Sequence, residues 1–137
     1  MQFDITQNTL LFKQRAGTSR GTYTERKVWY VTLSDDNEPE HKGVGECAPL
    51  PLLSCDDMPD IEYEKLLKTF ANETAINGFI NYDSLKPYPS ILFGLETALW
   101  HYNRNTVRLS DTSFSKGQRG IRINGLIWMG TFDEMKH

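Results

Sequence analysis

The stretch GVGECAPLPLLS, residues 43–54, joins a strand pattern to an apolar loop. Two glycines flank Val44, and the segment KGVGEC, residues 42–47, has the pattern of a short strand. The loop that follows contains two prolines and three leucines, at Pro49, Leu50, Pro51, Leu52 and Leu53. Prolines restrict the freedom of a loop in the unfolded chain, and apolar loop residues are usually buried. The sequence therefore raises the question of what this stiff, hydrophobic loop covers.

Two further strand patterns precede this stretch. Apolar residues recur at every second position in residues 2–14 and again in residues 22–34, and period two is typical of β-strands. Between them, AGTSRGT, residues 16–22, has the composition of a turn. Three consecutive strands with short connections predict an antiparallel meander over residues 2–48.

The spacing of apolar residues becomes helical after the loop. A helix is predicted over about 59–77, ending at Asn77-Gly78, with one apolar face formed by Ile61, Leu66, Leu67, Phe70 and Ala71. A second helix is predicted over about 89–104, because proline suits a first helical turn. The predicted fold class is α+β, a three-stranded antiparallel meander followed by helices.

Composition excludes several classes of protein. The chain has 137 residues, 39% of them hydrophobic, which is within the usual size of one domain. A net charge of −3 without a basic patch argues against a nucleic-acid partner, and no apolar run approaches the ~20 residues of a membrane span. Without a basic, apolar signal at the N-terminus, we expect a cytoplasmic protein whose two cysteines are reduced thiols. The spacing of cysteines and histidines does not favour zinc.

The last 17 residues have a different pattern. IRINGLIWM, residues 121–129, alternates with both faces largely apolar in its second half, which is typical of a strand in a parallel sheet or barrel. Gly130 follows, and Thr131 and Glu134 then match a helical capping box. Since the sequence stops at His137, one turn later, we expect the first strand and helix start of a truncated barrel, joined to the meander and helices by a polar linker over 105–120. The alternative is a frayed C-terminal tail.

Four stretches together resemble a known family. They are AGTSRG (16–21), GVGECAPLP (43–51), SILFGLETALW (90–100) and INGLIWMG (123–130). In order and spacing they are similar to the N-terminal capping domain of the enolase superfamily, and within it to the o-succinylbenzoate synthase family. The resemblance covers essentially the whole chain. It implies a capping domain over 1–120 and, over 121–137, the beginning of a (β/α)7β barrel, whose remainder would be this chain's partner domain.

The resemblance also implies an activity. Family members dehydrate 2-succinyl-6-hydroxy-2,4-cyclohexadiene-1-carboxylate, a small cyclic carboxylate, to o-succinylbenzoate in menaquinone biosynthesis. A lysine of a Lys-x-Lys motif takes the proton, and Mg²⁺, held by three acidic residues on barrel strands, stabilises the enediolate. The sequence contains no Lys-x-Lys motif. We therefore expect no catalytic and no metal-binding residue in this chain, and no activity of the chain alone.

Three elements are candidates for contact with substrate. The loop with Pro49, Leu50, Pro51 and Leu52 could close the barrel mouth and exclude water; alternatively its leucines pack against the helices. Thr18, Ser19 and Arg20 form a second candidate lid, in which Arg20 would bind a substrate carboxylate or pair with an acid such as Glu46; alternatively Arg20 is a solvated turn residue. Asn124 would point into the barrel, or bond to neighbouring backbone.

Some positions differ from the family pattern. Leu52 stands where glycine often follows the second proline, Val44 replaces a common aromatic residue, and His101 replaces a frequent aspartate. These differences leave the resemblance to the superfamily in place.

Alternatives to the synthase reaction remain open at this level. A dipeptide epimerase or a muconate cycloisomerase would share the cap and the barrel. A stand-alone, non-catalytic interaction domain descended from the cap is a reading from another class. An isolated cap would expose the face that meets the barrel, which predicts self-association.

Overall fold

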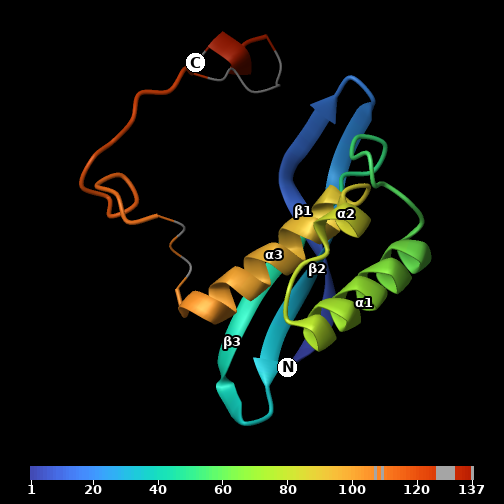
Figure 1. Ribbon diagram of the computed structural model, residues 1–137. Coiled ribbons are helices and arrows are strands. Elements are labelled where there is room, and N and C mark those ends of the chain that lie inside the picture. Colours follow the sequence, from blue (N-terminus) through green and yellow to red (C-terminus); the bar gives the residue numbers. More distant parts are fainter. Residues whose placement is uncertain (107, 109, 126–131, 137) are drawn as a thin grey trace.

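The computed structural model describes residues 1–106, 108, 110–125 and 132–136, in which three strands precede the helices (Figure 1). The strands are β1 (Gln2–Thr18), β2 (Gly21–Asp35) and β3 (Glu38–Cys47). The helices are α1 (Asp60–Asn77), α2 (Tyr82–Leu85) and α3 (Pro89–Arg104), and a short 3-10 helix follows at Glu134–Lys136. The predicted order of an antiparallel meander followed by helices is confirmed.

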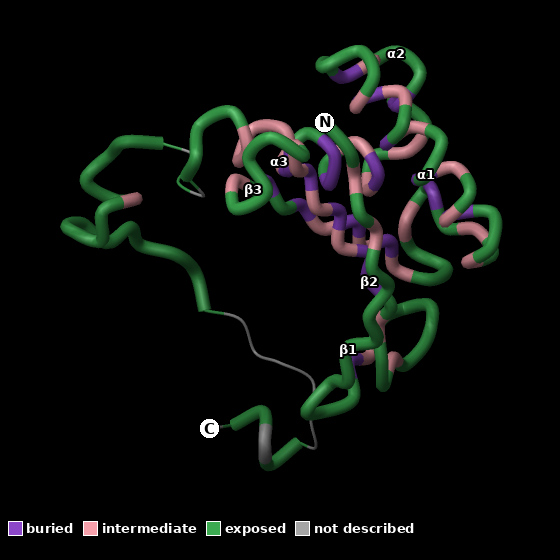
Figure 2. Tube along the Cα trace, turned by 90° about the horizontal axis from the view of Figure 1, so that it is seen from below, coloured by how far each residue is buried: buried purple, intermediate pink, exposed green. Residues whose placement is uncertain are grey.

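The sheet has the order β1-β2-β3, and both pairings are antiparallel. α1 and α3 cover one of its faces, and the core lies between the sheet and these helices (Figures 1 and 2). Trp29, Val31 and Leu33 in β2 point into this core and are at most 2% exposed. They are two residues apart, which is the spacing of side chains on one face of a strand.

Helix α3 lies unusually close to strand β3. A Cβ atom added to Gly45 would lie 1.9 Å from the carbonyl oxygen of Gly94, and one added to Gly43 would lie 2.1 Å from that of Ala98. From the helix side, a Cβ atom on Gly94 would lie 2.2 Å from Sγ of Cys47. No real side chain fits at such distances. The two glycines that flank Val44 therefore let the backbones of a helix and a strand touch.

The helix boundaries follow the sequence signals. α1 ends at Gly78, which has a left-handed conformation (φ 73°) and donates its N–H to the carbonyl of Thr74. α3 begins at Pro89, and Asn105 ends it with φ 49°. The short helix α2 was not predicted; Asn81 caps it by accepting the N–H of Ser84 at 3.3 Å. A helix of four residues is too short to give a periodic pattern.

The predicted apolar face of α1 is partly wrong. Leu67 and Ala71 are buried as expected, together with Tyr63 and Thr74, whereas Ile61 is 85% exposed. The buried residues are spaced by four, four and three positions, and this stripe does not include Ile61. The sequence of α1 contains more apolar residues than the buried stripe can hold, and Ile61 is one of those left exposed.

The hairpin of β1 and β2 is longer than predicted. β1 continues to Thr18, and Ser19 and Arg20 alone form the turn before β2 begins at Gly21. The pairing shifts register between Leu11 and Ala16, which marks a bulge. Figures 1 and 2 show this end of the hairpin extending beyond the helices, with most of its residues exposed. After the bulge the ladder continues through residues 16–18, which pair with residues 21–23.

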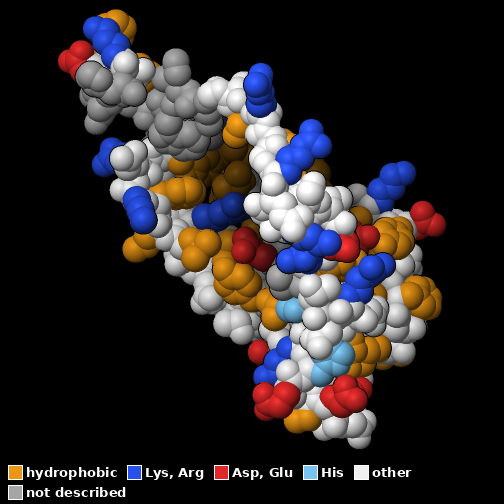
Figure 3. Space-filling model, turned by 90° about the vertical axis from the view of Figure 1, so that its left-hand side faces the viewer, with side chains coloured by type: hydrophobic (Ala, Val, Ile, Leu, Met, Phe, Trp, Pro, Cys, Tyr) orange, Lys and Arg blue, Asp and Glu red, His pale blue; other side chains and the backbone are white. Residues whose placement is uncertain are grey.

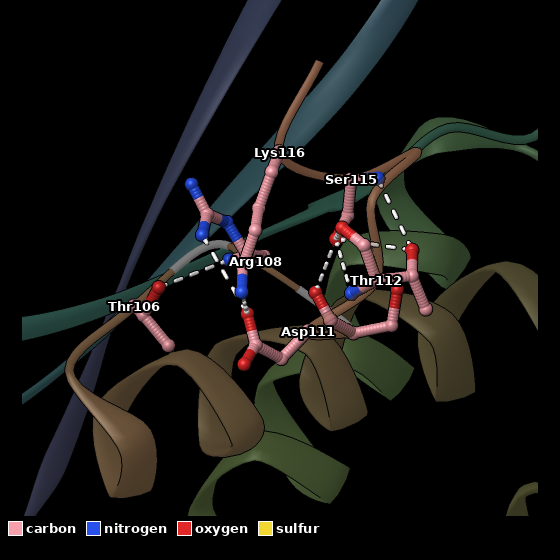
Figure 4. Close-up of polar contacts among 7 residues, drawn as sticks. Thr106, Arg108, Asp111, Thr112, Ser115 and Lys116 are labelled. Carbon is pink, nitrogen blue, oxygen red and sulfur yellow. Dashed lines mark hydrogen bonds and ion pairs between the residues drawn. The ribbon is translucent and has the colours of Figure 1, made fainter. Parts of the chain in front are cut away.

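Residues 105–125 form no helix or strand where the structure describes them. Their polar side chains bond largely within the segment: Lys116 Nζ pairs with Asp111 Oδ1 at 2.9 Å, and Ser115 Oγ donates to the carbonyl of Ser110 at 2.6 Å (Figure 4). The linker predicted over 105–120 and the proposed division into a domain over 1–120 and a second over 121–137 stay predictions.

The strand predicted over 121–129 is not formed in its described half, because residues 121–125 are irregular and exposed. The second half, 126–129, lies outside the described residues, as do Gly130 and Thr131, so the predicted capping box is not tested. A strand needs a neighbouring backbone to complete its hydrogen bonds, and no described strand pairs with 121–125. The alternating pattern predicts which residues share a face of a strand, and it does not show whether a second strand is present to pair with it.

Among the described residues, the helices are all too short or too polar to cross a membrane.

We predict that Gly45→Ala lowers the free energy of unfolding by about 3 kcal/mol or more, because the new methyl group collides with the backbone of α3 and forces it off the sheet. Urea unfolding followed by circular dichroism measures the change. Val44→Ala is the matched control: Val44 is 41% exposed and its truncation should cost less than about 1 kcal/mol. Equal losses in the two variants would show that the helix–strand contact is not close.

Candidate functional site

The turn between β1 and β2 is held by its own side chains. Thr18 Oγ1 donates to the carbonyl of Gly21 and accepts the N–H of Arg20, both at 3.2 Å. Thr18, Ser19 and Arg20 are all exposed. The predicted lid residues of this turn therefore lie at the tip of the hairpin, with their side chains at the surface.

The loop after β3 is closed by internal hydrogen bonds. Leu50 donates its N–H to Ser54 Oγ at 2.8 Å, and Ser54 donates its N–H to the carbonyl of Leu50 at 2.9 Å. The N–H of Leu52 binds Asp57 Oδ2 at 2.7 Å. These bonds, with the two prolines, make residues 49–57 an ordered unit.

Three side chains of the hairpin bind the backbone of this loop. Arg20 Nη1 donates to the carbonyl of Leu52 at 2.9 Å, and the hydroxyl of Tyr23 donates to that of Pro51 at 2.6 Å. Arg26 Nη2 donates to the carbonyl of Ala48. The structure thus joins the two predicted lids, and Arg20 does so through a main-chain carbonyl rather than through Glu46.

The leucines of the loop differ in exposure. Pro49 is buried and Leu50 is half-buried, whereas Leu52 is 64% and Leu53 is 39% exposed. The alternative that all three leucines pack against the helices is therefore wrong for Leu52 and Leu53. The loop presents two apolar side chains outward while its backbone is fixed.

Leu52 has an unfavourable backbone conformation. Its φ is 63°, in the left-handed region where a side chain collides with the backbone at a cost of about 1–2 kcal/mol. This is the position at which the family pattern favours glycine. The hydrogen bonds at the N–H and carbonyl of Leu52 hold it in this conformation.

Two hollows flank the loop. One, of about 250 Å³, lies between β2 and the loop and is lined in part by Lys27, Trp29, Pro49, Pro51 and Met58. The other, of about 350 Å³, lies beside the start of α3 and is lined by Arg26, Glu46, Ala48, Ser90 and Phe93. Figure 3 shows hydrophobic side chains gathered on one face of the molecule.

The second hollow is lined by Ser90, which belongs to a buried cluster of polar side chains that also contains Tyr63 and Cys47. Burial raises the pKa of the Cys47 thiol to about 12, although its hydrogen bond with Tyr63 acts in the opposite direction. Burial also raises the pKa of the Tyr63 hydroxyl well above its usual range. Both groups therefore stay protonated at neutral pH, and Cys47 is an unreactive thiol rather than a nucleophile. The other cysteine, Cys55, is free and exposed.

Asn124 is not brought to the lids. It is exposed, and its side chain donates weakly to the carbonyl of Gly125 at 3.3 Å. Its predicted role in a barrel stays a prediction.

The described residues contain no group of three or more His, Cys, Asp or Glu side chains that could hold a metal ion. They therefore do not fit a Mg²⁺ site of the family type, which needs several carboxylates together.

The sequence did not identify four residues that hold this site together: Tyr23, Arg26, Asp56 and Ser90. Tyr23 and Arg26 lie in a strand, where they resemble ordinary surface residues of a hairpin. Asp56 and Ser90 are 34 positions apart, and no local spacing links them. The one available signal was position: Ser90 opens one of the stretches that carry the family resemblance, and the other three residues follow such a stretch by two to five positions.

Comparisons with known proteins agree on one family. Residues 6–102 match the family described as MenC, N-terminal domain. The chain is 32% identical to an o-succinylbenzoate synthase of Desulfotalea psychrophila, in an alignment that covers 95% of this chain and 43% of that protein.

Solved structures resemble the fold. An enolase family member from Agrobacterium tumefaciens with homology to dipeptide epimerases matches with a TM-score of 0.60 and 18% identity, over 97% of this chain and 40% of that one. An o-succinylbenzoate synthase from Thermosynechococcus elongatus, solved with Mg in the active site, matches with a TM-score of 0.48 and 16% identity over 80% and 31%. The chain spans less than half the length of each of these proteins.

We predict that Leu52→Gly raises the free energy of unfolding by about 0.5–1 kcal/mol, since glycine removes the left-handed strain and little buried surface is lost. Thermal unfolding of the two proteins gives the difference. Leu53→Gly is the matched control: Leu53 has no positive φ, so glycine there should destabilise by about 0.5–1 kcal/mol. A loss of stability in both variants would mean that Leu52 is not strained.

Proposed function

Because this chain belongs to the MenC N-terminal domain family of the enolase superfamily, we propose that it caps the active site of an o-succinylbenzoate synthase. In the proposed reaction a base removes the proton from the carbon that bears the carboxylate. The ring hydroxyl leaves as water, and the cyclohexadiene becomes the aromatic ring of o-succinylbenzoate. The pathway served would be menaquinone biosynthesis.

One observation carries this proposal: the two candidate lids form a single braced unit that presents apolar side chains outward. Arg20 and Tyr23 fix the loop backbone, and Leu52 stays 64% exposed on it. An exposed leucine on an ordered loop gains no stability where it stands, but it can cover an apolar ring. Strained backbone of this kind is typical of positions kept for function.

The lid would act by excluding water and by fixing the substrate. Removal of a proton from carbon creates an anion, which fixed dipoles stabilise better in a dry site than in bulk water. Leu52 and Leu53 would contact the ring. Arg20, which is exposed at the tip of the hairpin, would bind a carboxylate of the substrate or keep the lid closed through Leu52.

The base and the metal ion of the family would come from outside the described residues. The sequence has no Lys-x-Lys motif, and the described side chains form no cluster suited to Mg²⁺. The chain's own part in the reaction is therefore positioning and shielding, and we propose that it is inactive by itself.

The proposal predicts that the complete gene product dehydrates the cyclohexadiene carboxylate and that this 137-residue chain alone does not. Formation of the aromatic product, followed by absorbance with and without a chelator of Mg²⁺, measures both. We expect turnover that the chelator abolishes. Epimerisation of L-Ala-L-Glu without dehydration would favour a dipeptide epimerase, and no turnover of either substrate would favour an interaction domain.

We further predict that Arg20→Met in the complete gene product lowers kcat/KM by about tenfold, because the lid loses its bond to Leu52 and a carboxylate ligand. Arg15→Met is the matched control, since Arg15 is an exposed arginine of the same hairpin with no bond to the loop. Its kcat/KM should stay within about twofold of the unsubstituted enzyme. Unchanged kinetics in Arg20→Met would remove Arg20 from the site.

A further inference from the structure

The loop ends in two neighbouring aspartates whose side chains bind in different directions. Asp57 is exposed and binds the N–H of Leu52, at the apolar tip of the loop. Asp56 is only 3% exposed, and its Oδ2 atom accepts the N–H of Ser90 at 2.7 Å and the Ser90 hydroxyl at 2.5 Å. One aspartate therefore holds the tip, and the other anchors the base of the loop to α3.

The anchor uses the free end of a helix. Tyr88, at the N-cap position of α3, makes no side-chain cap bond, and the first turn of α3 contains no acidic residue. Helix N-termini attract negative charge and need acceptors for their free N–H groups. Asp56, which lies 34 positions earlier in the sequence, supplies the negative charge and the acceptor oxygen. The loop is thus joined to the helix that touches β3 most closely.

The anchor is itself held from the other side. The Tyr63 hydroxyl lies 2.6 Å from Ser90 Oγ, and Tyr63 is 1% exposed with its ring 4.5 Å from that of Trp29. Among the described residues, Oδ1 of Asp56 has no hydrogen-bond partner, although it is buried. A buried carboxylate with one unpaired oxygen is costly, so this arrangement is not the most stable way to pack a loop base.

We infer that Asp56 and Ser90 are positioning residues that set the place of the lid leucines over the substrate. This inference rests on the proposed function and deepens it. Asp56 fixes the base of the loop to α3, Asp57 fixes the tip to the base, and Arg20 and Tyr23 fix the same tip to the hairpin. The apolar side chain of Leu52 is therefore located by contacts on both sides of the loop.

The test substitutes the helix side of the anchor, which is less disruptive than removing a buried carboxylate. Ser90→Ala deletes the hydroxyl bond and keeps the N–H bond to Asp56; Ser90→Thr restores a hydroxyl. Asp56→Asn keeps one acceptor oxygen but removes the charge, and Asp83→Asn, at an exposed aspartate of α2, is its control. Each variant is made in the complete gene product.

Steady-state kinetics separate positioning from mere stability. A misplaced lid weakens substrate binding, so KM should rise about five- to tenfold in Ser90→Ala and Asp56→Asn, with kcat within about twofold. A variant that only unfolds more loses active enzyme, which lowers the measured kcat and leaves KM unchanged. We expect Ser90→Thr to restore KM and Asp83→Asn to leave it unaltered. An unchanged KM in both Ser90→Ala and Asp56→Asn overturns the inference.

Hydrogen exchange tests the anchor of Asp56 and Ser90 separately from the proposed function. If the complete gene product does not dehydrate the substrate, the proposed function is wrong and the anchor is judged from the amides of Leu50, Leu52 and Ser54, which are hydrogen-bonded in the loop. Exchange at least about tenfold faster in Ser90→Ala than in the parent supports the anchor. Equal rates overturn it.

Discussion

Helix α3 and strand β3 meet through backbone atoms, and this close contact fixes where the loop after β3 can reach the start of the helix. Gly45 and Gly94 leave room for only backbone atoms between the helix and the strand. The strand leads directly into the apolar loop, and the start of the helix lies beside the base of that loop. A wider helix–strand spacing would separate Ser90 from Asp56. The glycines of the sequence thus set the distance across which a loop and a helix end can bond.

The loop and the hairpin behave as one unit for a simple physical reason. Backbone carbonyls that face outward from a tight loop need donors, and long side chains of the neighbouring hairpin supply them at Ala48, Pro51 and Leu52. At Leu52, whose φ is 63°, the bond from Arg20 to the carbonyl adds to the bond from its N–H to Asp57 within the loop. Backbone strain is therefore stored at Leu52, an exposed residue of the loop.

Much of the fold could be predicted from the sequence because its signals are local. Period-two alternation identified the strands, and Gly78 and Pro89 marked helix ends. The face of α1 was less well predicted: Ile61 fits an apolar helix pattern equally well, and only the position of the sheet decides which stripe is buried. The strand expected after residue 120 illustrates the same limit, because alternation specifies faces and provides no pairing partner.

Local patterns in the sequence predicted the three strands and the helices α1 and α3, and four short stretches predicted the family. How the two loops are held became visible in the folded structure alone. The contacts of Arg20 with Leu52 and of Asp56 with Ser90 span more than 30 positions, and two of the bonded groups, the carbonyl of Leu52 and the N–H of Ser90, are backbone groups that carry no sequence signal. Such bonds depend on where the backbone lies after folding, and the identity of the amino acids does not encode them locally.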